Sequence, residues 1–178
     1  MKHLSYLLLM ALIAGTLHAD EVTNAKTSEE VAGIAPSTDE ARSRARLLHE
    51  TIHASLQIVH QEYYREGESL KIPAATMRQV FREVSERQNI QLRWLVVDAQ
   101  AMNADHKPQN DFEKQAAEAL AAGKSSHEQV EGATYRHVGR IALTSDCLKC
   151  HAPNRTSNKE RVAGLIITIP LAQPHTKP

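Results

Sequence analysis

The sequence has few aromatic residues, few cysteines and no net charge, and each of these shortages excludes a class of protein. Aromatic residues are 4% of the 178 positions, so a core has to come mainly from Leu, Val, Ile and Ala within the 42% hydrophobic fraction. The formal net charge of +0 gives no electrostatic reason to expect nucleic acid or an anionic membrane as the main partner. Two cysteines cannot build a scaffold of several disulfides, and seven glycines with seven prolines exclude collagen-like and low-complexity classes. This length and composition predict one globular domain.

The sequence has one short apolar run, at its N-terminus, and no long apolar run after it. A basic start, Met1–His3, precedes the apolar segment Leu4–Gly15, and the small residue Ala19 lies just before Asp20. About 12 apolar residues are too few to cross a bilayer as a helix. The layout is typical of a secretory signal peptide over residues 1–19, with an uncleaved anchor as the alternative. No cysteine lies near the cut, which excludes a lipoprotein anchor. We therefore expect a periplasmic or otherwise exported protein without an integral membrane segment after cleavage.

The rest of the chain reads as a flexible leader (20–36), one domain (37–171) and a polar tail (172–178). Ser37 and Glu40 form a capping-box pattern that predicts a helix to about Arg65. Its expected apolar face comprises Leu48, Ile52, Leu56, Val59 and Tyr63.

Further elements follow from apolar periodicity and from capping residues. We expect a helix from Pro73 to near Asn89, a strand over Ile90–Val97, a loop over 99–109, a helix from Asn110 or Asp111 to Ala122, and strands over Thr134–Leu143 and Val162–Ile169, the last two separated by a loop that carries both cysteines. The fold class is α+β, with a long N-terminal helix and a small antiparallel sheet covered by helices on one face.

Both cysteines fall in one pentapeptide, Cys147-Leu148-Lys149-Cys150-His151. A C-x-x-C-H run is the attachment signature of c-type haem. The two thiols add across the vinyl groups of haem, and the adjacent histidine is delivered to the iron as the proximal ligand. The export signal agrees, because haem of this type is attached outside the cytoplasm. The sequence thus predicts one covalent haem c held by Cys147, Cys150 and His151.

Two other uses of a C-x-x-C motif are weighed against haem. A redox dithiol of the thioredoxin type normally opens a helix after a strand, whereas Ala152-Pro153-Asn154 reads as a loop here. A structural zinc site needs two more ligands. His137 is available as one of them, but there is no second C-x-x-C.

The second iron ligand has to come from elsewhere in the chain. His49, His53 and His60 share about one face of the first helix, because 11 residues turn roughly 20° beyond three full turns. His60 is the first choice, since Val59 and Tyr63 flank it at the end expected to be buried. The alternatives are His53, Met77 and His49, with core packing the ordinary role of Met77. The remaining internal histidines, His106, His127 and His137, are expected at the surface or behind the ligands.

The chain resembles the single-haem c-type cytochrome domains with a PAS-like fold, a family first catalogued as a domain of unknown function. The resemblance covers about residues 40–170. It rests on the helical N-terminal half, the strand and Asn-containing loop from Leu92 to Pro108, the Asp111-Phe112-Glu113 helix start, Tyr135-Arg136, the C-terminal C-L-x-C-H and the last strand ending at Pro170. It implies haem held against a sheet, in redox or sensing roles. Some members use a distal cysteine, which this chain lacks, so the distal ligand does not transfer.

Three functions are compatible with these patterns. The first is a periplasmic mono-haem electron carrier whose iron has two protein ligands and which serves an unknown redox partner protein. The second is a redox or gas sensor with a displaceable distal ligand. The third, a small peroxidase, would need distal acid–base residues, and no distal His–Arg pair is evident. We expect an electron carrier that is not an enzyme, present as a monomer or a homodimer.

Overall fold

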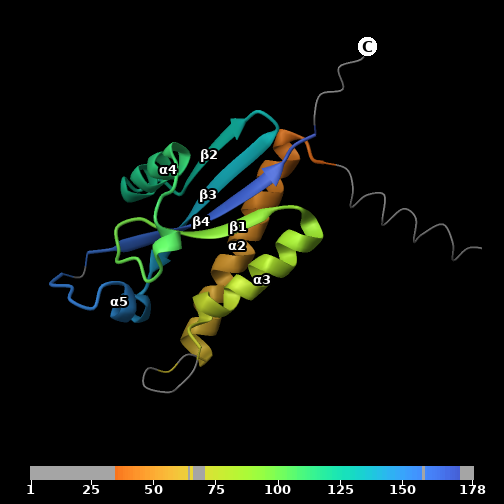
Figure 1. Ribbon diagram of the computed structural model, residues 1–178. Coiled ribbons are helices and arrows are strands. Elements are labelled where there is room, and N and C mark those ends of the chain that lie inside the picture. Colours follow the sequence, from red (N-terminus) through yellow and green to blue (C-terminus); the bar gives the residue numbers. More distant parts are fainter. Residues whose placement is uncertain (1–34, 64, 66–70, 158, 173–178) are drawn as a thin grey trace, which may run out of the picture. The chain divides into compact units, whose positions relative to one another are not determined.

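The computed structural model describes residues 35–63, 65, 71–157 and 159–172. The expected signal peptide and most of the leader lie outside these residues. In chain order the elements are α2 (Thr38–Tyr63), α3 (Pro73–Gln88), β1 (Gln91–Val96), η1 (Ala104–His106), α4 (Asp111–Ala121), β2 (Ser126–Glu131), β3 (Thr134–Leu143), α5 (Ser145–His151) and β4 (Arg161–Pro170) (Figure 1). None of the described helices is long and apolar enough to cross a membrane.

The strands form one four-stranded sheet in the order β1-β4-β3-β2, and every neighbouring pair is antiparallel. The two long strands, β3 and β4, lie at its centre and are paired along their whole lengths. In this register Leu165 on β4 stands between Trp94 on β1 and Gly139 on β3. The α+β class, the antiparallel sheet and the long N-terminal helix expected from the sequence are confirmed.

Helices cover both faces of the sheet, so the expectation that they lie on one face is wrong. Helices α2 and α3 pack on the face that carries Trp94, Leu165 and Ile167. Helix α4 packs on the opposite face, where Val138 and Ile166 are buried. The central strands are apolar on both sides, and a sheet of this kind needs a cover on each to keep its side chains out of water.

The starts of the helices follow their sequence signals. The Ser37 backbone N–H donates to Glu40 Oε2 over 2.8 Å, and the Glu40 N–H donates to Ser37 Oγ over 3.4 Å, which completes the capping box. Pro73 opens α3, and the Asn110 side chain accepts from the backbone N–H of Glu113 at the start of α4.

Two elements differ from expectation. The edge strand β2 was not foreseen, because Ser126–Glu131 is polar and only half buried, with one apolar residue, Val130. Its pairing with β3 makes it a strand. The cysteines lie in a short helix, α5, instead of a loop.

The apolar face of α2 is buried only in part. Ile52 is buried and Leu56 half-buried, but Val59 and Tyr63 are 41% and 72% exposed. The final turns of α2 lie beside α3 and extend past the sheet (Figure 1), so the stripe continues beyond the surface that it was expected to cover.

Candidate functional site

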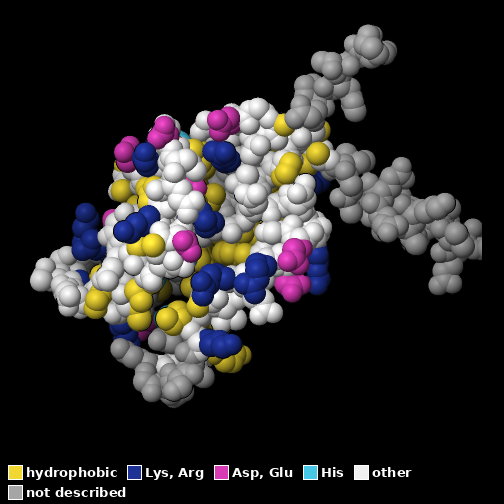
Figure 2. All heavy atoms as spheres, viewed as in Figure 1, with side chains coloured by type: hydrophobic (Ala, Val, Ile, Leu, Met, Phe, Trp, Pro, Cys, Tyr) yellow, Lys and Arg dark blue, Asp and Glu magenta, His cyan; other side chains and the backbone are white. Residues whose placement is uncertain are grey.

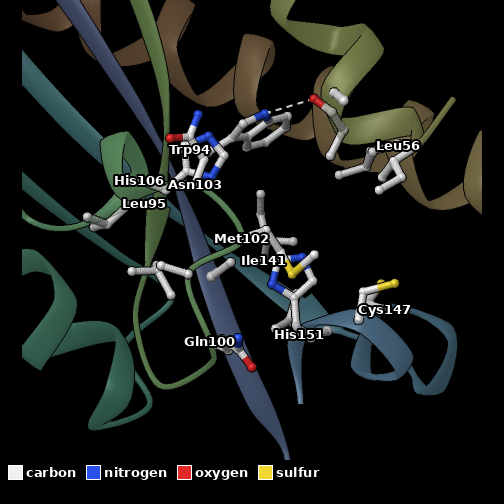
Figure 3. A pocket seen from close by; sticks show the side chains of 18 of the residues that line it. Leu56, Trp94, Leu95, Gln100, Met102, Asn103, His106, Ile141, Cys147 and His151 are labelled. Carbon is white, nitrogen blue, oxygen red and sulfur yellow. Dashed lines mark hydrogen bonds between the residues drawn. The ribbon is translucent and has the colours of Figure 1, made fainter. Parts of the chain in front are cut away.

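A cavity of about 540 Å³ lies between α2, α3, the loop after β1, and α5. Its walls are mainly apolar and include Leu56, Trp94, Ile141 and Leu143. Trp94 is held in place by a hydrogen bond of 3.1 Å from its Nε1 to the carbonyl oxygen of Ala74 (Figure 3). Apolar cavities of about 300–1,000 Å³ that contain a few polar groups are typical of cofactor and small-molecule sites.

Helix α5 places the sequence motif at the edge of this cavity. Cys147 and Cys150 are three residues apart on a helix, which brings both to one side, and both line the cavity with His151. Figure 3 shows Cys147 and His151 beside each other at this edge. Both thiols are free and half-buried, and Cys147 Sγ lies 3.2 Å from Thr144 Oγ1. Two thiols and an imidazole are therefore available to one bound group.

His151 is suited to binding a metal ion. Burial lowers the pKa of its imidazole; the backbone of Gln100 opposes this shift, and the nearby His60 adds to it. The neutral ring that results is the form that binds metals. Its Nδ1 atom is buried and has no hydrogen-bond partner among the described residues. The Gln100 N–H donates to the His151 carbonyl oxygen over 2.8 Å, which ties the loop after β1 to the end of α5.

Of the four residues expected as the second iron ligand, the structure brings only His60 to the cavity among the residues it describes. His49 packs against His53 and His137, and Met77 lines a separate groove between α2 and α3. A shared helical face fixes the direction in which these side chains point, but not where each one lies along the helix axis. His49 and His60 lie about 16 Å apart along the axis of α2, since a helix rises 1.5 Å per residue. His49, His53 and Met77 do not line the cavity, so His60 is the one of the four candidates that is placed to reach a group bound there.

Several cavity residues were not predicted as site residues from the sequence. Met102, Asn103 and His106 come from the loop after β1, and Arg78 comes from α3. His106 was expected at the surface or behind the ligands, yet it is a half-buried part of the wall (Figure 3). The sequence signal that could have pointed to the residues of the loop after β1 is the Asn-containing loop that supports the family resemblance.

The structure bears differently on the two alternatives to haem, a zinc site and a redox dithiol. Among the described residues, no group of three or more His, Cys, Asp or Glu is placed to hold a metal ion, so zinc has no ligand set there. Ala152-Pro153-Asn154 is a loop, as expected, but the C-x-x-C itself lies in a helix that directly follows β3. Local structure alone therefore does not exclude a dithiol. What favours haem over a dithiol is the combination with His151 and a large apolar cavity, which a disulfide exchanger does not need. The residues present therefore fit a flat apolar group attached at this edge.

A model of the Tll0287-like family matches residues 35–166, which is most of the chain. The chain belongs to the Tll0287-like family. Its fold is also similar to that of a protein solved as "Crystal structure of the cyanobacterial heme-protein Tll0287". The TM-score is 0.50 with 15% sequence identity, over 85% of this chain and 98% of the other. At this identity the likeness concerns the fold. No match was found among curated proteins.

This member of the Tll0287-like family also has a buried histidine cluster, formed by His49, His53 and His137. The rings of His49 and His137 lie 6.1 Å apart between centroids, and those of His49 and His53 lie 5.6 Å apart. His49 and His137 are 6% and 2% exposed. His49 Nε2 and His137 Nδ1 have no hydrogen-bond partner in the part of the chain that the structure describes. Burial makes the charged form of His137 costly at this interface and so lowers the pKa of its ring.

Acid should therefore destabilise the protein through His137. Burial, with a smaller contribution from His49, lowers the pKa of His137 from 6.5 to about 4 in the folded state. Between these values the unfolded chain binds the proton and the folded chain does not. Stability is full above about pH 6.5 and falls as the pH drops toward 4, by about 3 kcal/mol in total. Urea unfolding at several pH values measures this, with His137→Phe as the control that lacks the titrating group. Equal pH slopes in the two proteins would contradict the assignment.

Proposed function

We propose that this chain carries one haem c, attached through Cys147 and Cys150, with His151 as an iron ligand. The observation that carries this proposal is the placement of both thiols and the imidazole at one edge of a single apolar cavity. Membership of the Tll0287-like family and the fold shared with a protein described as a haem protein support it.

Different residues around the cavity have different roles in binding such a group. The two cysteines attach it, and His151 supplies a neutral imidazole from the last residue of α5. Trp94, Ile141 and Leu143 give it dry walls against the sheet. When bound, haem iron supplies a one-electron redox couple. A rigid apolar pocket with two protein ligands keeps reorganisation small, which suits electron transfer better than catalysis.

We assign the protein the role of an exported electron carrier, with His60 as the second iron ligand. His60 lines the same cavity as His151. Burial is the main cause of the lowered pKa of His151, and His60 is near enough to add to that shift. The signal-peptide pattern before Asp20 supports export to the compartment where haem c is attached. The electron donor or acceptor would be another exported redox protein.

The test is to express the full chain, with its leader, in a bacterial host that attaches haem c. Haem should stay with the polypeptide on a denaturing gel, and the reduced protein should show sharp bands that carbon monoxide leaves unchanged. Absence of covalent haem overturns the assignment. Covalent haem whose reduced bands shift with carbon monoxide would replace the electron carrier by a sensor with a displaceable ligand.

Replacing His60 with alanine should open one face of the iron. The reduced His60→Ala protein is expected to bind carbon monoxide and to change from a low-spin to a high-spin spectrum, because a strong ligand is lost. His53→Ala is the matched control, a histidine of the same helix that does not line the cavity. It should keep the wild-type spectrum. A low-spin, carbon-monoxide-insensitive His60→Ala protein would rule out His60 as the ligand.

A further inference from the structure

The described lining of the cavity includes one carboxylate and one guanidinium, which come from different elements. At the cysteine end, Asp146 is the lining carboxylate, and Lys149 Nζ lies 3.2 Å from its Oδ1. Arg78 on α3 is the single lysine or arginine among the described residues that line the cavity. No carboxylate of the described residues lies within ion-pair distance of the Arg78 guanidinium, whose Nε reaches only the Ala75 carbonyl oxygen, at 3.4 Å. Among the described residues, the cavity thus has a cation without an anionic partner.

Two neutral polar side chains accompany this arginine. Burial lowers the pKa of His106, and the nearby Arg78 adds to this shift. Asn103 lies beside His106 in Figure 3, on the far side of the cavity from Cys147. The Asn103 side chain accepts from the Asp105 N–H through its oxygen at 3.0 Å, which leaves its NH₂ group as a donor. Arg78, Asn103 and His106 are called here the polar end of the cavity.

The loop that carries two of these residues is fixed in place. Arg93 on β1 donates to the carbonyl oxygens of Asp105 and Lys107, and it forms an ion pair with the buried carboxylate of Glu113. Glu113 in turn accepts from the Gln109 N–H over 2.6 Å. The loop is therefore held at Asp105, Lys107 and Gln109, and its donors are preorganised.

We propose that the polar end binds the two carboxylates of the haem, so that Arg78 pairs with them and Asn103 and His106 donate hydrogen bonds. This inference rests on the proposed function and gives the bound group one orientation. Haem has its vinyl groups on one half of the ring and its carboxylates on the other. Thioether bonds at Cys147 and Cys150 direct the carboxylates away from Asp146 and toward Arg78. A guanidinium is the side chain best shaped for carboxylates, which are costly to leave unpaired at an apolar cavity.

The experiment compares exported, haem-loaded wild-type protein with Arg78→Gln, Arg78→Lys and Arg82→Gln. Arg82 is one turn further along α3, is exposed and does not line the cavity, so it is the matched control. Arg78→Gln should keep covalent haem but lower the midpoint potential, because a positive charge that favours the reduced iron is lost. Its potential should also depend more steeply on pH between about pH 5 and pH 8, since an unpaired carboxylate has a raised pKa. Redox difference infrared spectra should show shifted carboxylate bands.

Arg82→Gln should match the wild type in all three measurements. Arg78→Lys keeps the charge without the planar fork, so its potential should lie between those of the wild type and Arg78→Gln, with shifted carboxylate bands. If Arg78→Gln is not exported, Arg78→Lys serves as the test variant. Haem-loaded Arg78 variants that match the wild type in potential, pH dependence and carboxylate bands would overturn the proposal. Wild-type protein without covalent haem would overturn the proposed function itself.

Discussion

Protein exported with Cys147 and Cys150 both replaced by alanine should carry no covalently bound haem. The two sulfurs are the chain's only thiols, so no other side chain can form a thioether bond. The expected change is from one haem per chain to none on a denaturing gel, with the mass of the polypeptide lowered accordingly. Single replacements should leave one thioether each. His151 remains in the double variant, so any haem that it still binds should be extracted by acid and organic solvent.

The matched control for this experiment is Lys149→Ala. Lys149 lies between the two cysteines in α5 and does not line the cavity. Its removal keeps the C-x-x-C-H spacing, so haem attachment should be normal. Covalent haem on the double-alanine protein, or its loss from Lys149→Ala, would contradict the attachment that we propose.

Gly139→Ala should be the most destabilising single-methyl change at the helix–sheet interface. A Cβ atom at position 139 would lie 2.1 Å from Cδ2 and 2.3 Å from Nε2 of His49, far inside van der Waals contact. The ring is buried and is enclosed by His53 and His137, so it has little room to move away. Overpacking of this kind costs about 1–3 kcal/mol and occasionally more, and we expect at least the upper end of that range. The free energy of unfolding measured with denaturant gives the value.

A double-mutant cycle with His49→Ala isolates the cause. Removal of the imidazole deletes the atoms that the new methyl group meets, so Gly139→Ala should cost much less in the His49→Ala background. Equal costs in the two backgrounds would show that contact with His49 is not the reason for glycine at this position. The cycle also measures how closely α2 packs against β3 at this position.

Local signals in the sequence predicted the features that depend on neighbouring residues. The capping box at Ser37 and the first-turn proline at Pro73 marked the starts of two helices, and the alternation over Thr134–Leu143 matched β3 residue for residue. The C-x-x-C-H run marked, from its spacing alone, two thiols and an imidazole that the structure places at one cavity. These features follow from bond geometry and hydrogen bonds within a few residues of the chain, so no fold is needed to predict them.

The features that the sequence did not predict depend on long-range pairing. Ser126–Glu131 becomes a strand because β3 offers it an edge, since its own pattern is too polar to indicate one. Helices cover both sheet faces because β3 and β4 lie at the centre of the sheet. The periodicity of a sequence does not predict the order of strands within a sheet.

The sequence by itself determined which residues are available for the proposed attachment, and only the tertiary structure decided what surrounds them. The spacing of Cys147, Cys150 and His151 is local, so it could be read without a fold. His60 was the first choice from the sequence, but only the fold shows that it lines the cavity while His49 does not. The approach of Arg78 and His106 to the same cavity likewise depends on how the elements pack against the sheet. A helical period gives the direction in which a side chain points, whereas its depth is set by packing between elements distant in sequence.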